Sequence, residues 1–395
     1  MKTLDTPNKK IIIDSEQQDK NNLSTPTSQK VRLEMTMEKA EELLSRPESN
    51  RTIQLPNGQK VCITESGDPN GIPAIMMSGM GMHSRKYVLL LNNYGVKYKV
   101  RIIGFDRPSI DGSDPIYFKK TSRKPKKQIK KKSMSLQNTN SKNNIENLNS
   151  SEVNKEKEEK DSSYKLKKGQ VDLKVYAEWV EAIIDTLGIQ RLHLMSLCIG
   201  GLYVLGCVKY FKQPEKIVGP LYLIAPWAKA QKCVTSVRFV DKCIPIPVIR
   251  FAMTCYYKLI GYMVPNAKKS PNALMFRLIH VDEKTDPLGG RRLLFSKILK
   301  SGFFLNETKQ IIHDDWELGF CVNSNNKLDF SIINKDVIIY HGTKDKLIPV
   351  KSSKYLIDKW NPNFKAELHL KKGKNHSNIK GSCLNDIFKS IVEHS

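Results

Sequence analysis

The sequence lacks the cysteine and histidine spacings that indicate a zinc site. Its eight cysteines include no Cys-x-x-Cys pair, and none is spaced with histidines as zinc ligands are. Residues Met1–Asn22 hold no apolar segment with a cleavage site behind it, and no uncharged apolar run reaches the ~18 residues of a membrane-spanning helix. We therefore expect no bound metal, no signal peptide and no membrane span. Reduced cysteines and a cytoplasmic location are the corresponding expectations.

Acidic residues are also scarce. The chain has 40 Asp and Glu against 65 Lys and Arg, which gives a formal net charge of +25. Part of the excess lies in a Lys- and Asn-rich stretch, residues 115–169, which we expect to be a disordered insertion. Its run Arg123–Lys132 resembles a nuclear-localisation signal, so the nucleus is a second expected compartment. That run has no aromatic residues to stack on bases, and we expect no specific nucleic-acid partner.

Short β-rich runs alternate with helical periodicity along most of the chain. The expected strands are Thr52–Leu55, Val61–Thr64, Ala74–Ser78, Val100–Phe105, Leu192–Leu197, Leu221–Ile224, Val337–Tyr340 and Ala366–Leu370. Helical patterns separate the later runs, which predicts an α/β fold with a mostly parallel sheet. The first two runs are joined only by Pro56-Asn57-Gly58, whose Asn-Gly step favours an antiparallel hairpin.

The composition changes along the chain predict its domain organisation. Residues 1–48 are polar and are expected to form a disordered tail, apart from a short helix over Met35–Leu44. Residues 49–395 are expected to form one α/β domain that contains the insertion. From 227 to 334 the β-rich runs stop and the sequence becomes helical and basic, which predicts a cap inserted between two late strands.

The turn that follows Leu192–Leu197 carries the strongest indication of chemistry. In a nucleophile elbow, small residues stand two places before and two places after the reactive residue, because strand and helix approach closely there. Centred on Cys198, these residues are Ser196 and Gly200. Centred on Ser196, they would be Leu194 and Cys198, which crowd the turn. The spacing favours Cys198 as the nucleophile and leaves Ser196 as the alternative.

Five segments, in this order, resemble the α/β-hydrolase superfamily. They are the hairpin Arg51–Lys60 with Glu65–Gly71, the loop Ser78–Gly81, the pair Phe105–Pro108 and Gly112–Asp114, the elbow, and the late segments His341–Pro349 and Gly373–His376. The resemblance covers about residues 51 to 392 once the Lys-rich insertion is removed. It implies an α/β-hydrolase sheet with an antiparallel N-terminal hairpin and a helical cap.

The resemblance also implies a catalytic triad. Carried over residue by residue, Cys198 is the nucleophile, His376 carries the proton, and Asp345 holds the imidazole in its productive tautomer. The sequence departs from the usual pattern in having cysteine in place of serine. A second departure is Ser78, where this loop often has histidine.

The same resemblance implies the groups around the triad. The backbone N–H groups of Met80 and Ile199 would form the oxyanion hole. Gly200 and Gly201 would shape the elbow between strand and helix.

These residues imply a hydrolase that acts on an ester, thioester or lactone through an acyl-enzyme, with no cofactor. Two alternatives remain open: a catalytically inactive protein of this fold that binds a ligand or partner under the cap, and a scaffold whose basic insertion is the functional part. The apolar run Ile244–Pro265 favours a helix that covers a small-molecule acyl substrate. Because 229–309 holds 15 basic and 5 acidic residues, contact with an anionic membrane surface is a further expectation.

Overall fold

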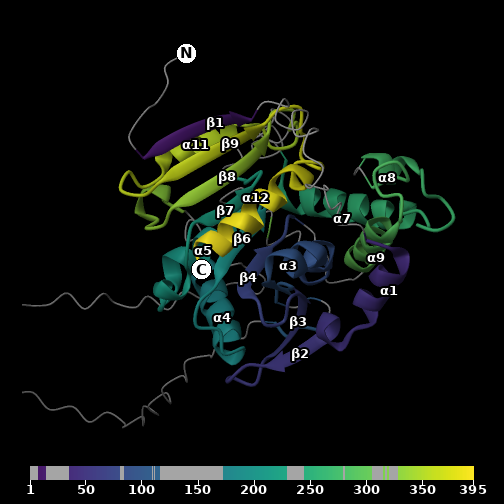
Figure 1. Ribbon diagram of the computed structural model, residues 1–395, viewed down its shortest axis with the longest axis horizontal. Helices are drawn as coiled ribbons and strands as arrows, with labels where there is room; N and C mark the ends of the chain where they lie inside the picture. Colours follow the sequence, from purple (N-terminus) through teal and green to yellow (C-terminus); the bar gives the residue numbers. More distant parts are fainter. Residues whose placement is uncertain are drawn as a thin grey trace, which may run out of the picture. The chain divides into compact units, whose positions relative to one another are not determined.

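The computed structural model describes residues 8–14, 35–80, 84–108, 110, 112–115, 172–228, 244–278, 281–304, 315, 318–319 and 328–395. Its centre is a nine-stranded sheet with the strand order β1-β9-β8-β7-β6-β4-β5-β3-β2 (Figure 1). The strands are β1 (Lys9–Asp14), β2 (Arg51–Gln54), β3 (Lys60–Gly67), β4 (Ile72–Met77), β5 (Val100–Phe105), β6 (His193–Leu197), β7 (Leu221–Ile224), β8 (Val337–Gly342) and β9 (Ala366–Lys371). Every strand expected from the sequence is present, and β1 is an addition.

The hairpin expected at the sheet edge is confirmed. Strands β2 and β3 pair antiparallel, with Arg51 opposite Ile63. Gly58 adopts a φ of +82°, a left-handed conformation that glycine enters without steric cost, and its N–H donates to the Leu55 carbonyl at 2.8 Å. Strand β3 also pairs antiparallel with β5, and all the remaining pairings are parallel.

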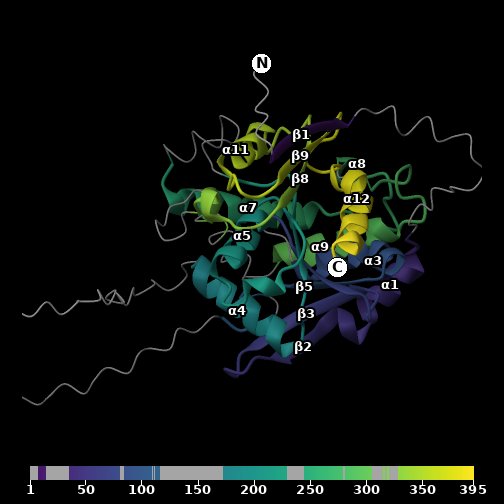
Figure 2. The ribbon, with the colours of Figure 1, turned by 60° about the vertical axis from the view of Figure 1, so that its left-hand side comes forward.

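Helices cover both faces of the sheet. They are α2 (Ser84–Tyr87), α3 (Asn92–Tyr98), α4 (Leu173–Thr186), α5 (Gly200–Tyr210), α11 (Lys351–Lys359) and α12 (Lys380–Glu393), with short 3-10 turns at Pro47–Asn50, Val88–Leu91, Pro214–Lys216 and Phe330–Ile332. Figure 2 shows α3 and α12 on one side of the sheet and α4, α5 and α11 on the other. The central strands β6 and β7 are buried along their whole length, as expected for parallel strands covered on both faces. The predicted fold class is therefore confirmed.

Within the described residues, three helices lie between β7 and β8, where the sequence predicts a cap. They are α7 (Ile246–Met263), α8 (Leu274–Leu278) and α9 (Gly290–Phe304). Phe276, Leu294 and Ile298 are almost fully buried in a second apolar cluster, separate from the main core. The cap therefore shares a small second core with Leu89 and with the segment Met35–Leu43. Among the described residues, no helix combines the length and apolar character that crossing a bilayer requires.

The tail expected to be disordered, residues 1–48, contains one strand that was not expected, and the short helix expected over Met35–Leu44 is present. Strand β1 pairs parallel with β9, with Lys9 opposite Ala366. Helix α1 (Met37–Ser45) begins at Thr36, whose hydroxyl accepts from the Lys39 N–H. The α1 residue Leu43 is buried in the cap cluster, where α1 packs against α9. The isoleucines of β1 and the amphipathic face of α1 have partners far along the chain, which local composition does not reveal.

The Lys-rich insertion predicted over 115–169 lies almost entirely outside the described residues, which resume at Asp172. Asp172 caps helix α4 by accepting from the N–H groups of Lys174 and Val175. Helix α4 then packs against α5, the helix that follows the elbow.

Candidate active site

The elbow lies between β6, which ends at Leu197, and α5, which begins at Gly200. Cys198 has a φ of +58°, an uncommon conformation for a non-glycine residue. Its N–H donates to the Ile224 carbonyl at 2.9 Å, and its carbonyl accepts from the N–H groups of Gly201 and Trp227, both at 3.2 Å. These bonds to β7, α5 and the segment after β7 hold the strained backbone in place.

The two glycines of the elbow differ in what they require. A Cβ added at Gly200 would stand 2.2 Å from the Met77 carbonyl oxygen and 2.7 Å from that of Ser78. A Cβ at Gly201 would meet nothing closer than 3.5 Å, an ordinary contact with Pro226. Only Gly200 is therefore needed for the close approach of α5 to β4. Gly201 was expected to shape the elbow as well, but its position has room for a side chain.

Ser196, the alternative nucleophile, lies inside strand β6. It pairs with Met77 on β4 and Leu223 on β7. Its hydroxyl is completely buried and has no hydrogen-bond partner within the described parts of the chain. The strand conformation places it away from the turn that presents Cys198.

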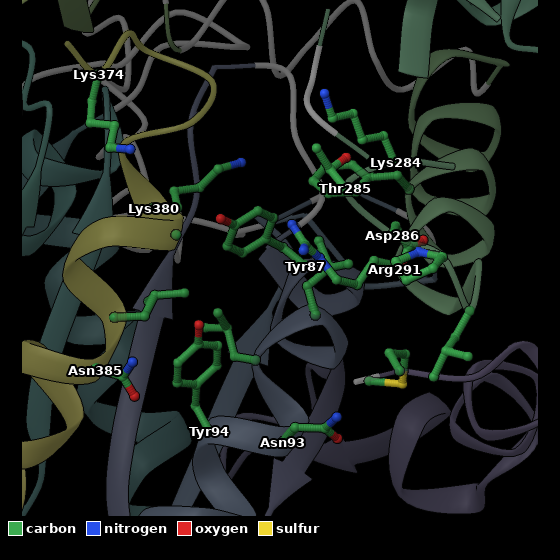
Figure 3. Close-up of a pocket in the computed structure, with 18 residues that line it drawn as sticks. Tyr87, Asn93, Tyr94, Lys284, Thr285, Asp286, Arg291, Lys374, Lys380 and Asn385 are labelled. Carbon is green, nitrogen blue, oxygen red and sulfur yellow. The ribbon is translucent and has the colours of Figure 1, made fainter. Parts of the chain in front are cut away.

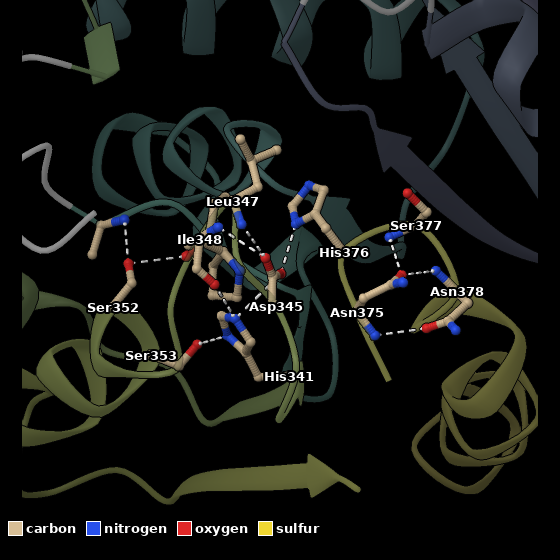
Figure 4. Close-up of polar contacts among 12 residues, drawn as sticks. His341, Asp345, Leu347, Ile348, Ser352, Ser353, Asn375, His376, Ser377 and Asn378 are labelled. Atoms are coloured by element: carbon tan, nitrogen blue, oxygen red, sulfur yellow. Dashed lines mark hydrogen bonds and ion pairs between the residues drawn. The ribbon is translucent and has the colours of Figure 1, made fainter. Parts of the chain in front are cut away.

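Asp345 and His376, which the sequence placed in one triad, are in contact. The Nδ1 of His376 lies 2.7 Å from Oδ2 of Asp345 (Figure 4). The other carboxylate oxygen accepts from the N–H groups of Leu347 and Ile348, at 2.9 and 2.8 Å. Because a carboxylate only accepts, His376 donates through Nδ1, which leaves its Nε2 for Cys198.

The charged forms of His376 and Asp345 stabilise each other. Burial opposes protonation of His376, but its hydrogen bonds with Asp345 and Cys198 outweigh burial and raise its pKa to about 10. Burial likewise raises the pKa of Asp345, yet hydrogen bonds from His341, His376 and the Ile348 N–H hold that pKa well below its usual range. The imidazole of His376 therefore lies between a carboxylate and the Cys198 thiol, where its protonated form is stabilised.

His341, near the end of β8, supports the acid. It is fully buried, and its Nε2 lies 2.7 Å from the Ile348 carbonyl and 3.5 Å from Oδ2 of Asp345. A carbonyl only accepts, so Nε2 carries a proton and Nδ1 accepts from the Ser353 hydroxyl at 2.6 Å. This arrangement fixes the loop that carries Asp345.

The residues expected to form the oxyanion hole come from two segments of the chain. Ile199 is the residue before α5, and Met80 ends the described part of the loop after β4. The next residues of that loop, 81–83, lie outside the described residues. Ser78, at the position where histidine is common, is buried, and its carbonyl accepts from Arg107 at 3.4 Å.

A buried network near this loop was not foreseen from the sequence. The Arg107 guanidinium pairs with Asp315 at 2.8 Å, and the Tyr203 hydroxyl donates to the same carboxylate at 3.0 Å. Arg107 also lies over the Tyr203 ring, 4.7 Å from its centroid. The network joins the segment after β5, helix α5 and the chain between cap and β8. No local pattern around Asp315 could reveal partners so distant in sequence.

The chain between α9 and β8 also touches the elbow directly. The Nε1–H of Trp227 donates to the Gly319 carbonyl at 2.8 Å. A Cβ at Gly319 would stand 2.8 Å from the Ile199 side chain, so Gly319 lies close against an expected oxyanion residue. Within the described residues, no group of His, Cys, Asp and Glu is arranged to hold a metal ion.

No protein-family model matches this sequence, and no curated protein sequence is similar to it. Solved structures do match. An esterase from Rhodococcus sp. ECU1013 has 12% identity and a TM-score of 0.50, covering 88% of this chain and 100% of its own. A 2-hydroxy-6-oxo-6-phenylhexa-2,4-dienoate hydrolase from Rhodococcus sp. strain RHA1 has 13% identity and a TM-score of 0.50, covering 87% and 99%. An α/β-hydrolase fold protein from Nakamurella multipartita has 14% identity and a TM-score of 0.51, covering 87% and 99%.

Likeness at this level of identity establishes the fold and leaves the chemistry to the residues of the site. The protein has the α/β-hydrolase fold.

Proposed function

We propose that the protein hydrolyses an ester, thioester or lactone through an acyl-enzyme on Cys198. One observation carries the proposal: the strained elbow residue is a cysteine that interacts with His376, and His376 in turn is bonded to Asp345. A nucleophile, a base and a group that orients the base are the parts that acyl transfer needs. No cofactor enters this scheme.

In the first half of the reaction, His376 holds the proton of Cys198 while the sulfur attacks the substrate carbonyl. The carbonyl oxygen becomes negative, and the N–H groups of Ile199 and Met80 would stabilise it, each by about 3–4 kcal/mol. The N-terminus of α5 adds a favourable dipole at the same point. When the tetrahedral intermediate collapses, His376 gives its proton to the leaving alcohol or thiol, and the acyl group remains on sulfur.

In the second half, water replaces the leaving group. The water oxygen attacks the thioester carbon while His376 accepts a proton from the water. His376 then returns that proton to the Cys198 sulfur as the free acid leaves. Asp345 stays ionised throughout, since its pKa is held low, and it keeps the Nδ1–H in place. Three of the solved structures with this fold bear the names esterase, hydrolase and phospholipase, which is compatible with such chemistry.

The test is hydrolysis of p-nitrophenyl acetate and butyrate by wild type, Cys198→Ala, His376→Ala and Ser196→Ala, with iodoacetamide labelling of the wild type. We expect the first two variants to lose activity and Ser196→Ala to retain it. Cys198 should be alkylated faster than Cys207, which is buried and whose thiol has a pKa raised by burial.

Two outcomes would contradict the proposal. Loss of activity in Ser196→Ala alone would move the nucleophile into β6. A wild type with no product burst, and with Cys198 no more reactive than Cys207, would favour a protein of this fold that binds a ligand without turning it over.

A further inference from the structure

A pocket of about 680 Å³ lies outside the triad, beside the first turn of α12. Its walls come from the segment Tyr87–Tyr94, the start of α12, and the loop 284–288 with α9. Figure 3 shows Lys374 and Lys380 on the α12 side, Lys284 and Arg291 on the cap side, and Tyr87 between them. Neither Cys198 nor His376 lines it, so this is a second site.

The charge of the pocket is one-sided. Four cations line it, Lys284, Arg291, Lys374 and Lys380, and a single carboxylate, that of Asp286. The Asp286 carboxylate is already engaged, because it accepts from the Arg292 N–H at 2.7 Å. Among the described residues, no ion pair involves the side chains of the three lysines.

Two other half-buried cations of the chain have acidic partners. Lys371 lies 2.8 Å from Asp14 and 2.7 Å from Asp386, and Arg101 lies 2.6 Å from Glu65. Lys380 instead lies over two aromatic rings, 5.3 Å from the centroid of Tyr87 and 5.2 Å from that of Phe295. Aromatic faces compensate only partly for the water that a half-buried ammonium loses.

The incomplete compensation lowers the pKa of Lys380. Burial, with a smaller contribution from the positive charge of Arg291, lowers its pKa to about 8. A negative ligand in the pocket would counter this lowering of the pKa, because it would place an opposite charge beside Lys380.

The walls indicate what else the ligand carries. Leu91, Phe295 and Leu384 line the pocket together with the rings of Tyr87 and Tyr94. Such surfaces suit an apolar or aromatic group. The excess of three positive charges suits a phosphate, which carries about −1.5 to −2 at neutral pH, better than a carboxylate with one charge.

We propose that this pocket binds a small organic phosphate, with the phosphate among Lys284, Arg291, Lys374 and Lys380 and its apolar group against Tyr87 and Phe295. The lysines reach the phosphate as flexible point charges, and Arg291 offers a planar pair of donors. The site is independent of the acyl chemistry proposed for Cys198.

Isothermal titration of the full-length protein tests the proposal with 1-naphthyl phosphate, inorganic phosphate and 1-naphthol. The expected order of affinity is 1-naphthyl phosphate first, then inorganic phosphate, then 1-naphthol. Lys380→Met and Lys284→Met should each weaken 1-naphthyl phosphate binding by about tenfold, the loss of one charge-assisted contact. Lys284 is exposed, so its variant tests the charge without disturbing the buried wall.

Lys389→Met is the matched control, because Lys389 lies on the exposed side of the same helix and pairs with Glu393 at 3.7 Å. It should bind as wild type does, and so should Cys198→Ala, which separates this site from the triad. Absence of saturable binding by wild type would overturn the proposal. Equal affinity in Lys284→Met, Lys389→Met and wild type would overturn it as well, as would tighter binding of 1-naphthol than of its phosphate.

Discussion

The Nδ1 of His376 lies 2.7 Å from Oδ2 of Asp345, and this contact joins two loops at the ends of β8 and β9. The carboxylate is fully buried, whereas the imidazole keeps about a fifth of its surface exposed: the side chains are 0% and 20% accessible. One partner is thus anchored inside the protein, and the other reaches out toward the elbow.

Asp345→Asn should therefore destabilise the protein in a pH-dependent way. Since the folded pKa of His376 is about 10, above its unfolded value of about 6.5, its stabilisation is complete below that unfolded value and is lost as pH rises through about 10. The folded pKa of Asp345 is lowered, so its contribution is present above about pH 4 and is lost as pH falls further. Thermal unfolding should show the largest difference from wild type near pH 5–6, about 3–5 kcal/mol, shrinking toward pH 10.

The control is Asp358→Asn, which removes an exposed carboxylate from α11. Its stability should follow that of wild type at every pH. A stability loss in Asp345→Asn that is constant from pH 5 to pH 10 would show that the ion pair is not its source.

The elbow glycines provide a matched pair of substitutions. Gly200→Ala places a methyl group 2.2 Å from a backbone carbonyl, so β4 and α5 must separate, and we expect a loss of more than about 2 kcal/mol with loss of esterase activity. Gly201→Ala has room and lies in the first turn of α5, so it should be neutral or stabilising by up to about 1 kcal/mol. Chemical denaturation measures both. Equal effects of the two substitutions would show that the close approach is absent.

Arg107→Met tests the network between the cap segment and the core. It leaves the Asp315 carboxylate buried without its guanidinium partner, and breaking such a pair costs about 3–5 kcal/mol. Lys39→Met removes an exposed partner of Glu42, and that should cost less than about 1 kcal/mol. Denaturant midpoints compare them, with limited proteolysis after α9 as a second measurement. If the two variants lose the same stability, the buried pair does not fasten this segment.

Membrane contact stays a prediction. The surface that would make this contact is one face of α7. Val248, Phe251, Leu259 and Tyr262 recur at helical spacing on α7 and are all exposed. The described residues of 244–304 hold 10 basic and 3 acidic residues, a charge that suits anionic lipid.

A Phe251→Ser, Leu259→Ser double variant should lose most co-sedimentation with vesicles that contain phosphatidylglycerol, and high salt should weaken binding of the wild type. Val392→Ser, which removes an exposed valine from α12, is the control and should bind normally. Equal binding to neutral phosphatidylcholine vesicles would contradict an electrostatic contribution.

The sequence predicted the elements whose determinants are local. The elbow follows from small residues two places on either side of Cys198, and the hairpin follows from Asn57-Gly58. The order of the strands β2–β9 along the chain follows from alternating patterns. The assignment of Asp345 and His376 follows from the resemblance of their segments to the α/β-hydrolase superfamily. Each of these needs only neighbours in sequence or a fixed chain order.

The remainder depends on contacts between distant segments. The Arg107–Asp315 pair exists only once the chain before β8 folds back over the elbow. The cationic pocket likewise draws Lys284 and Lys380 from two separate segments. Gly201, which the motif grouped with Gly200, is distinguished only by the atoms that surround each of them.

The pairing of β1 with β9 has a consequence for how the protein is made. Strand β1 leaves the ribosome early, but the edge that it joins is formed by β9, after the cap and β8 have been synthesised. The sheet therefore cannot be completed during translation of its first half, and the row of N–H and C=O groups along β9 stays open until β1 docks. Docking of this early segment is thus the step that closes the sheet's edge. An extension attached close to Lys9 would affect how readily β1 docks.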